Sequence, residues 1–146
     1  MERLVHATEL FTPAERGVAL EVIDSYLEHP GRDYTALGAF TRREDLTGFL
    51  CYGPTPCTDG TWDLYWIAVS GEARGRGIGT LLLEEMERRL VDQHARLVLI
   101  ETSSRADYAP TRAFYERRGY RIVARVPDFY APGDDRLIFA RTIHGV

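Results

Sequence analysis

A short run of alternating glycines and arginines, Arg74-Gly75-Arg76-Gly77-Ile78-Gly79, has the residue types of an anion-binding turn. Glycine allows the backbone to turn tightly and to approach a ligand closely. A helix predicted to begin at Ile78 would add unpaired N–H groups and a partial positive charge, and both favour phosphate. The segment, with Thr80 after it, therefore predicts a phosphate or pyrophosphate site. A tight strand-to-helix connection without a ligand would use the same glycines.

The sequence of this turn does not match two common phosphate-binding motifs. A Walker sequence needs Lys and then Ser or Thr after its last glycine, whereas Gly79 is followed by Thr80 and Leu81. A dinucleotide fingerprint that begins at Gly75 needs a third glycine where this chain has Thr80. The antiparallel hairpin predicted upstream also fits a dinucleotide-binding unit poorly.

Hydrophobic periodicity places the turn between a strand and a helix. Residues 61–69 are rich in aromatic and β-branched side chains, and residues 78–92 have one apolar helix face. Before the turn, we expect a helix from Thr12 and a hairpin of strands at 34–40 and 46–52. After it, we expect a strand at 97–102 and a helix at 108–118 that is capped by Asp107 and ends at Gly119. Strands at 120–126 and 136–142, joined by a loop at 127–134, complete the chain. This order predicts one α/β domain over residues 1–146 with a mixed sheet.

Two motifs together resemble the GNAT superfamily of N-acetyltransferases. Its acetyl-CoA signature, Gln/Arg-x-x-Gly-x-Gly/Ala, is matched from Arg74 to Gly79, and residues 64–69 are similar to the strand that precedes it. The segment Phe114-Tyr115-Glu116-Arg117-Arg118-Gly119-Tyr120 resembles the second motif of the family. The resemblance covers roughly residues 33–142. It implies a GNAT-like fold, with a mixed, mostly antiparallel sheet and helices on both faces. It also implies an enzyme that transfers an acetyl group from acetyl-CoA directly to an amine.

The resemblance also implies cofactor-binding roles. Backbone groups of Ile67, Ala68 and Val69 would pair with the pantetheine arm like an added strand. Arg112 and Arg118 would meet the adenosine-side phosphate, or else form a solvated helix face. The chain departs from the family at Tyr108, where many members carry an Asn, and no strand is predicted before the first helix.

Acetyl transfer from a thioester to an amine requires a base, donors to the developing oxyanion and an acid for the leaving thiolate. The resemblance assigns the acid role to Tyr115, whose alternative is a buried aromatic on an amphipathic helix. Asp63, expected to share a strand face with Tyr65 and Ile67, matches a position where some members carry a catalytic carboxylate. Glu101 ends the next strand among apolar residues, and burial there would suit a base. Asp63, Glu101 and a water chain all stay open as the base.

The loop expected at 127–134 is the predicted substrate side. Asp128, Phe129 and Tyr130 combine a carboxylate with aromatic rings, which suits a cationic amine, and Tyr65 could line the same cavity. In GNAT folds the corresponding loop borders the acceptor site, although a plain connection could have this composition. The acceptor would be a small-molecule amine or a protein N-terminus. A non-catalytic acyl-CoA-binding domain is the alternative function.

Composition narrows the function classes further. The net charge of -4 argues against a nucleic-acid binder. Two cysteines and four scattered histidines predict neither a disulfide framework nor a metal site. No signal peptide and no apolar run of membrane-spanning length is found, so we expect a cytoplasmic protein without a membrane partner. The sequence leaves a homodimer open.

Overall fold

The computed structural model describes residues 34–41, 45–71 and 75–143. The helix expected from Thr12 lies outside the described residues, as does Arg74. The described residues do not test the expectation of helices on both sheet faces, which stays a prediction.

The described elements follow the order expected from the sequence. The strands are β1 (Thr35–Phe40), β2 (Leu46–Pro54), β3 (Thr61–Val69), β4 (Leu97–Ser103), β5 (Arg121–Ala131) and β6 (Asp134–Thr142). The helices are α3 (Ile78–Asp92), the short 3-10 helix η2 (Ala106–Tyr108) and α4 (Ala109–Arg117). The predicted hairpin, the strand before the glycine turn and the helix after it are confirmed.

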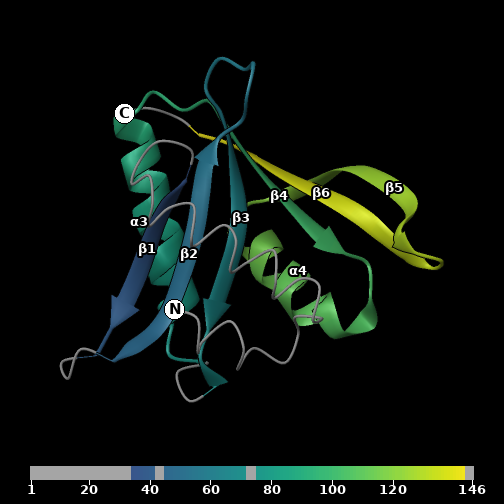
Figure 1. The fold of residues 1–146 in the computed structure, drawn as a ribbon, viewed down its shortest axis with the longest axis horizontal. Helices are drawn as coiled ribbons and strands as arrows, with labels where there is room; N and C mark the ends of the chain where they lie inside the picture. The colour runs from purple at the N-terminus through teal and green to yellow at the C-terminus, as the bar shows by residue number, and fades with distance from the viewer. Residues whose placement is uncertain (1–33, 42–44, 72–74, 144–146) are drawn as a thin grey trace.

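The six-stranded sheet has the order β1-β2-β3-β4-β6-β5. Its pairs are antiparallel except for β3 with β4, which confirms a mixed, mostly antiparallel sheet. The parallel ladder joins Thr61–Leu64 to Leu97–Ile100 and ends there, although both strands continue. Figure 1 shows β3 and β4 diverging from their paired ends. We call this divergence the split.

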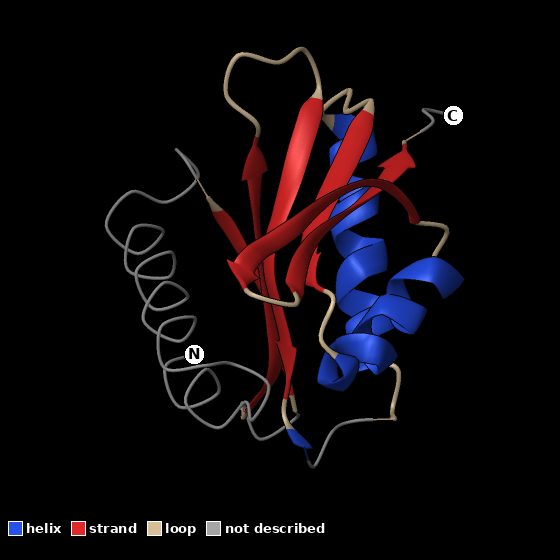
Figure 2. Ribbon diagram, turned by 90° about the vertical axis from the view of Figure 1, so that its right-hand side faces the viewer, coloured by secondary structure: helices blue, strands red, loops and turns tan. Residues whose placement is uncertain are grey.

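Both described α-helices pack against one face of the sheet (Figure 2). The apolar face predicted for α3 is buried, and its buried residues are Leu82, Leu83, Met86 and Leu90. They belong to one core cluster with Phe139 of β6 and Tyr115 of α4. Each fully buried large side chain contributes about 1.5–3 kcal/mol, so this core fixes the elements around the split. Neither α3 nor α4 has the length and apolar composition needed to cross a membrane.

A bulge interrupts the pairing of β2 with β3. Tyr52 lies opposite Leu64 and Cys51 lies opposite Trp66, so Tyr65 is the extra residue on β3. An inserted residue of this kind bends the strand and reverses the alternation of side chains beyond it.

The bulge therefore changes which β3 side chains share a face. Ile67 lies opposite Leu50, and Leu64 lies opposite Tyr52. Because opposed residues point to the same face, Ile67 and Leu64 both face the helices. Asp63, next to Leu64, faces the other side. The expectation that Asp63 and Ile67 share a face is wrong, because the sequence does not reveal the extra residue.

The predicted loop at 127–134 is also wrong, because most of it is strand. β5 continues to Ala131, and only Pro132 and Gly133 turn the chain into β6. The register shifts between Val126 and Ala131, and Asp128 has a φ of 54°. Pro127 and Asp128 thus lie in a bulge of a continuous hairpin. A bulge tolerates both the missing N–H of proline and the left-handed backbone of Asp128.

The helix expected at 108–118 begins differently from the prediction. Residues 106–108 form η2, and the N-cap of α4 is Tyr108, without a side-chain cap. The expected cap at Asp107 is wrong, because its carboxylate accepts a hydrogen bond from Arg105 Nε at 3.2 Å. Gly119 ends the helix as predicted, with a φ of 89° that glycine adopts readily.

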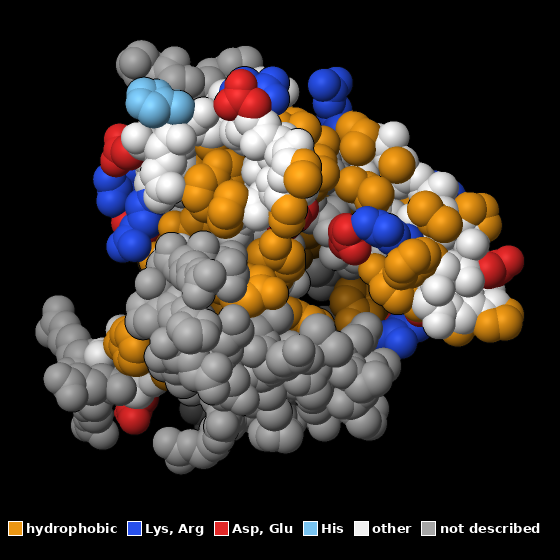
Figure 3. Space-filling view, turned by 45° about the horizontal axis from the view of Figure 1, so that its top comes forward, with side chains coloured by type: hydrophobic (Ala, Val, Ile, Leu, Met, Phe, Trp, Pro, Cys, Tyr) orange, Lys and Arg blue, Asp and Glu red, His pale blue; other side chains and the backbone are white. Residues whose placement is uncertain are grey.

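The β5–β6 hairpin projects from the body of the molecule (Figure 1). All residues of β5 are exposed, in contrast to β6, which contributes Leu137 and Phe139 to the core. In Figure 3 hydrophobic side chains gather along this projecting part of the surface. The hairpin therefore extends the sheet beyond the area that the described helices cover.

Candidate functional site

Gly75, Arg76 and Gly77 form an exposed turn directly before α3. The φ angles of Gly75 and Gly77 are 78° and 77°, in the left-handed region that favours glycine. A Cβ atom on either glycine would meet no atom of the described residues within 4 Å. The backbone of the turn thus borders open space, as close approach of a ligand requires.

The first turn of α3 presents backbone donors with no competing side chain. Gly77 is the N-cap, no side chain caps the helix, and the first turn holds no acidic residue. Leu81 N–H donates to the Gly77 carbonyl at 3.0 Å. The N–H groups of Ile78, Gly79 and Thr80 precede that bond, and the helix dipole adds to their positive potential. This arrangement suits a phosphate group.

The start of α3 lies beside both α4 and the end of β3. A Cβ atom on Gly79 would lie 3.4 Å from Phe114 Cζ and 3.8 Å from Val69 Cγ2. Both distances are ordinary van der Waals contacts, so the start of α3 lies directly against α4 and the end of β3. The phosphate-type turn and the diverging end of β3 therefore lie side by side.

Tyr115 lies on the helix side of the sheet, where the split begins. Its ring centroid is 5.7 Å from that of Phe139, which pairs with Ile100, the last β4 residue joined to β3. Only 4% of Tyr115 is exposed. Burial, with a smaller effect from Tyr108, raises the pKa of the Tyr115 hydroxyl well above its usual value. The hydroxyl therefore keeps its proton at neutral pH.

Asp63 and Glu101 lie on the opposite face of the sheet, on either side of the last ladder pair. Thr55 Oγ1 donates to Asp63 Oδ2 at 2.8 Å. Leu99 is opposite Asp63 in the parallel ladder, and Glu101 follows Leu99 on that face. Glu101 is exposed and forms an ion pair with Arg136. The burial expected around Glu101 is therefore absent.

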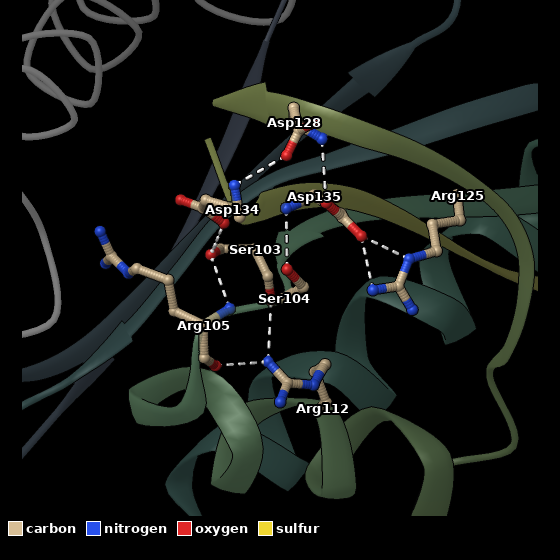
Figure 4. Close-up of polar contacts among 9 residues, drawn as sticks. Ser103, Ser104, Arg105, Arg112, Arg125, Asp128, Asp134 and Asp135 are labelled. Carbon is tan, nitrogen blue, oxygen red and sulfur yellow. Dashed lines mark hydrogen bonds and ion pairs between the residues drawn. The ribbon is translucent and has the colours of Figure 1, made fainter. Parts of the chain in front are cut away.

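The two arginines expected near the adenosine-side phosphate have partners within the protein. Arg112 Nη1 donates to the carbonyls of Ser103, at 2.9 Å, and Arg105, at 2.7 Å (Figure 4). This arginine thus joins α4 to the end of β4. Arg118 Nη1 lies 3.8 Å from a carboxylate oxygen of Glu84 on α3. Contact of either arginine with a phosphate stays a prediction.

Two of the predicted substrate residues lie near Glu101. The Arg136 guanidinium, which pairs with Glu101, lies over the Phe129 ring at 5.0 Å from its centroid. The Tyr130 ring packs edge-on against Phe129, with centroids 4.9 Å apart. This brings the hairpin aromatics to the β4 side of the split.

The other two predicted substrate residues serve different contacts. Asp128 Oδ1 accepts a hydrogen bond from Gly133 N–H at 2.7 Å, so its carboxylate stabilises the hairpin turn. Tyr65 packs edge-on against Tyr34, with centroids 5.2 Å apart. Tyr108 also has a partner, because the Arg105 guanidinium lies 5.0 Å from its ring centroid.

A polar seam of Ser103, Ser104, Asp134 and Asp135 joins the end of β4 to the hairpin (Figure 4). Ser103 Oγ donates to the Asp134 carboxylate. Asp135 N–H donates to Ser104 Oγ at 2.8 Å, and Ser104 N–H donates to the Asp135 carbonyl at 3.0 Å. Local sequence patterns do not predict this seam. Its only signal was a Ser pair after a buried strand and an Asp pair after a turn.

The carboxylate of Asp135 also holds the bulged part of β5. It accepts hydrogen bonds from Asp128 N–H at 2.9 Å and from Arg125 Nε at 2.5 Å. These two donors, the backbone N–H first, lower the pKa of Asp135 below its usual value. The charged form of Asp135 therefore contributes to hairpin stability.

Cys51 does not have the setting of a reactive thiolate. Cys51 is buried on β2, and burial raises the pKa of its thiol to about 12. Cys57 is exposed beyond β2. Within the described ranges, no group of three or more His, Cys, Asp or Glu residues is placed to hold a metal ion.

Comparison with known proteins places these features in a family. Residues 4–120 match the model of the acetyltransferase (GNAT) family, which is most of the chain. The chain belongs to the GNAT family of acetyltransferases. GNAT enzymes use acetyl-CoA. The match to the family model begins at residue 4, nearer the N-terminus than the two motifs recognised in the sequence.

The most informative relatives agree with this membership. An uncharacterised N-acetyltransferase of Methanocaldococcus jannaschii is 33% identical over 76 residues, 51% of this chain and 47% of that protein. The chain thus spans about half the length of this curated relative. A crystal structure from Desulfovibrio desulfuricans, assigned to the GNAT family, has a TM-score of 0.93 and 42% identity, over 98% of this chain and 90% of that one.

A more distant structure shows how widely the fold is shared. An aminoglycoside 6'-N-acetyltransferase complexed with coenzyme A has a TM-score of 0.77 and 20% identity. The alignment covers 99% of this chain and 89% of that one. At this identity the likeness establishes the fold alone.

The Gly77 backbone conformation yields a binding prediction. Gly77→Asp should weaken coenzyme A binding by about tenfold or more, measured by isothermal titration calorimetry, because it strains a left-handed residue and adds negative charge beside a phosphate site. Gly133→Ala is the matched control, since Gly133 has a φ of 79° and open space around it in the distant hairpin turn. Equal affinities for all three proteins would show that the phosphate does not bind at this turn.

The lowered pKa of Asp135 yields a stability prediction. Asp135→Asn should reduce the free energy of unfolding in urea at about pH 6, because it removes the charge that two donors stabilise. Because the pKa of Asp135 is lower in the folded than in the unfolded protein, its charge stabilises the fold fully at pH values above the unfolded pKa, which is near 4. This stabilisation is lost as the pH falls through the pKa of the folded protein. The difference from wild type should therefore shrink toward about pH 3.

The exposed Asp107 carboxylate, which pairs with Arg105, provides a control for that experiment. Asp107→Asn should change stability by less than about 0.5 kcal/mol. A deficit in Asp135→Asn that stays constant across the pH range would contradict the assignment to its charge.

Proposed function

We propose that this chain transfers the acetyl group of acetyl-CoA directly to a primary amine, either of a small molecule or of a protein N-terminus. One observation carries the proposal: the split between β3 and β4 opens beside the glycine turn and Tyr115. Family membership supports acetyl-CoA as the donor. A cytoplasmic location is part of the proposal.

The elements beside the split fit the extended shape of acetyl-CoA. In the described sheet, Ile67, Ala68 and Val69 pair with β2 on one side, while their ladder with β4 has already ended. Their other side can pair with the pantetheine amides as a further strand would. The Gly75–Gly77 turn and the first N–H groups of α3 would take the pyrophosphate. When bound, acetyl-CoA supplies an activated acetyl thioester.

Arg74, Arg76, Arg112 and Arg118 are the proposed sources of positive charge around that phosphate. Arg76 is exposed on the turn and is the best placed of the described three. Arg112 has one nitrogen bound to two carbonyls, so its proposed contact would use the remaining donors of the guanidinium. Tyr108 takes the position of the family Asn at the start of α4.

The transfer forms a C–N bond between the amine and the acetyl carbon and breaks the C–S bond. The amine loses a proton, and the leaving sulfur gains one. Tyr115 would donate the latter proton from the helix side, since its raised pKa keeps the hydroxyl protonated until charge develops nearby. A backbone N–H of Ile67, Ala68 or Val69 would polarise the acetyl carbonyl.

The amine proton would leave on the opposite face of the sheet. Asp63, Glu101 and a water chain are the candidate acceptors. We favour Asp63, because its described contact is a single hydrogen bond from Thr55, whereas Glu101 is paired with Arg136.

The acceptor would lie on the same face as these carboxylates. Phe129 and Tyr130 would contribute aromatic surface from the hairpin, and Tyr65 would approach from the bulge. Asp128 would act on the acceptor only through its free carboxylate oxygen or through the shape of the turn. Carboxylates and aromatic rings together favour a cationic amine.

An amine panel tests the proposed activity. Purified protein is incubated with acetyl-CoA and small amines, amino acids or peptides, and release of free thiol is followed. We expect acetylation of at least one cationic amine, confirmed by mass spectrometry of the product. Binding of acetyl-CoA without acetylation of any amine would favour the non-catalytic acyl-CoA-binding function instead.

Tyr115 provides a specific test of the proposed acid. Tyr115→Phe should lower kcat by about a hundredfold or more while leaving affinity for coenzyme A nearly unchanged, because only the hydroxyl is lost. Tyr120→Phe is the matched control, since Tyr120 is equally buried next to Tyr115. If both variants retain the wild-type kcat, Tyr115 is a packing residue.

A further inference from the structure

Arg136 lies on the same face of the sheet as the two candidate carboxylate bases. In the pairing of β4 with β6 it is opposite Ser103, two residues beyond Glu101. Its neighbour Leu137 belongs to the core on the helix side, so the side chain of Arg136 points to the other face, where Glu101 and Asp63 lie. Because β3, β4 and β6 are consecutive in the sheet, the three charged residues lie on adjacent strands beside the split.

Two contacts hold the Arg136 guanidinium in place. Its Nη2 pairs with Glu101 Oε1, and its central carbon lies 5.0 Å from the centroid of the Phe129 ring. A carboxylate on one edge and an aromatic ring on one face restrict the orientation of the group. A guanidinium ordered in this way loses little further conformational freedom when it binds a ligand.

The guanidinium also has donors that the described residues do not satisfy. Only Nη2 has an acceptor among them, although arginine carries five N–H groups on three nitrogens. Nε is buried without a hydrogen-bond partner in that part of the chain, and 27% of the side chain as a whole is exposed. Because partly buried polar groups are normally paired, the unused donors favour an anion at Nη1.

We propose that Arg136 binds a carboxylate of the acceptor, so that the acceptor is an amino acid or another small amine with a carboxylate. This inference rests on the proposed acetyl transfer and specifies its substrate. The carboxylate would form charge-assisted hydrogen bonds with Nη1, while the amine of the same molecule faces Asp63 and the acetyl group. A protonated amine without an anionic group would gain no contact from Arg136 and would be repelled by its charge.

The spacing of the strands agrees with a small acceptor. Arg136 on β6 and the split lie on either side of β4, and neighbouring strands are about 4.8 Å apart. A long side chain on β6 can therefore reach across one strand toward the split, as the contact of Arg136 with Glu101 on β4 shows. An amine and a carboxylate that are separated by a few bonds can then bind at the reacting position and at Arg136 together.

Paired acceptors test this inference. For each amino acid in a panel, kcat/KM for acetylation is divided by the kcat/KM of its carboxamide, which keeps the amine and lacks the carboxylate. Wild type should prefer at least one amino acid by about tenfold or more, because hydrogen bonds to a charged group are lost with the carboxamide. Arg136→Gln should lower that ratio about tenfold or more. The same amines are compared in both proteins, so differences in their basicity cancel.

Two further variants separate substrate binding from a structural role. Arg136→Lys keeps the charge but not the planar fork, so it should retain part of the ratio. Arg125→Gln is the matched control. Arg125 lies on the same hairpin and also pairs with a carboxylate, that of Asp135, but it is opposite Leu137 and therefore on the helix-side face. This variant should keep the wild-type ratio.

A wild type that acetylates carboxamides as well as amino acids would overturn this inference and leave the proposed function intact. So would an Arg136→Gln variant that lowers kcat/KM equally for both members of each pair, because Arg136 would then only neutralise Glu101. Acetylation of no amine would overturn the inference and the proposed function together. Circular dichroism and unchanged affinity for coenzyme A show that each variant is folded.

Discussion

The early end of the ladder between β3 and β4 is the constraint on which the arrangement depends. Leu64 and Ile100 form its last pair, and beyond them each strand is held by a different neighbour. β3 stays with β2, and β4 stays with β6. A backbone edge inside a sheet normally has its hydrogen bonds satisfied by the next strand. The split removes that partner at Ile67–Val69, which lead toward the phosphate-type turn.

The two sides of the split are stabilised by different physics. On the α3 side, the bulge at Tyr65 bends β3, and the apolar core holds the helix against it. On the other side, the polar seam ties the end of β4 to the start of β6. Arg112 then ties α4 to the same strand end. The proton donor and the carboxylates proposed for catalysis consequently occupy opposite faces at one fixed position.

The sequence predicted the elements well and their irregularities poorly. Alternation and helical spacing are local, so β3, α3 and the hairpin of β1 with β2 were found close to their observed bounds. The Tyr65 bulge depends on the register with β2, which no local pattern contains. Pro127 and Asp128 look like a loop because the same residues suit a loop and a bulge.

The candidate site was predictable to the same extent. The glycine turn was recognised because positive φ angles select glycine, and the structure shows those angles. Arg112 was expected near phosphate, although the structure binds it to two carbonyls, and the residue type alone does not distinguish these partners. The polar seam was missed because its members are far apart in the chain and pair only when β4 and β6 do.

The burial of Tyr115 has a consequence for how such a protein could change over time. Its described contacts are made by the ring, which packs against Phe114, Tyr120 and Phe139. If its hydroxyl supplies the proton, then the fold needs the ring and the reaction needs one oxygen atom. Loss of that atom by a single-base change to Phe would leave a folded chain with its phosphate-type turn intact. An enzyme and a non-catalytic cofactor-binding protein are then one substitution apart, and one can arise from the other without passing through an unfolded variant.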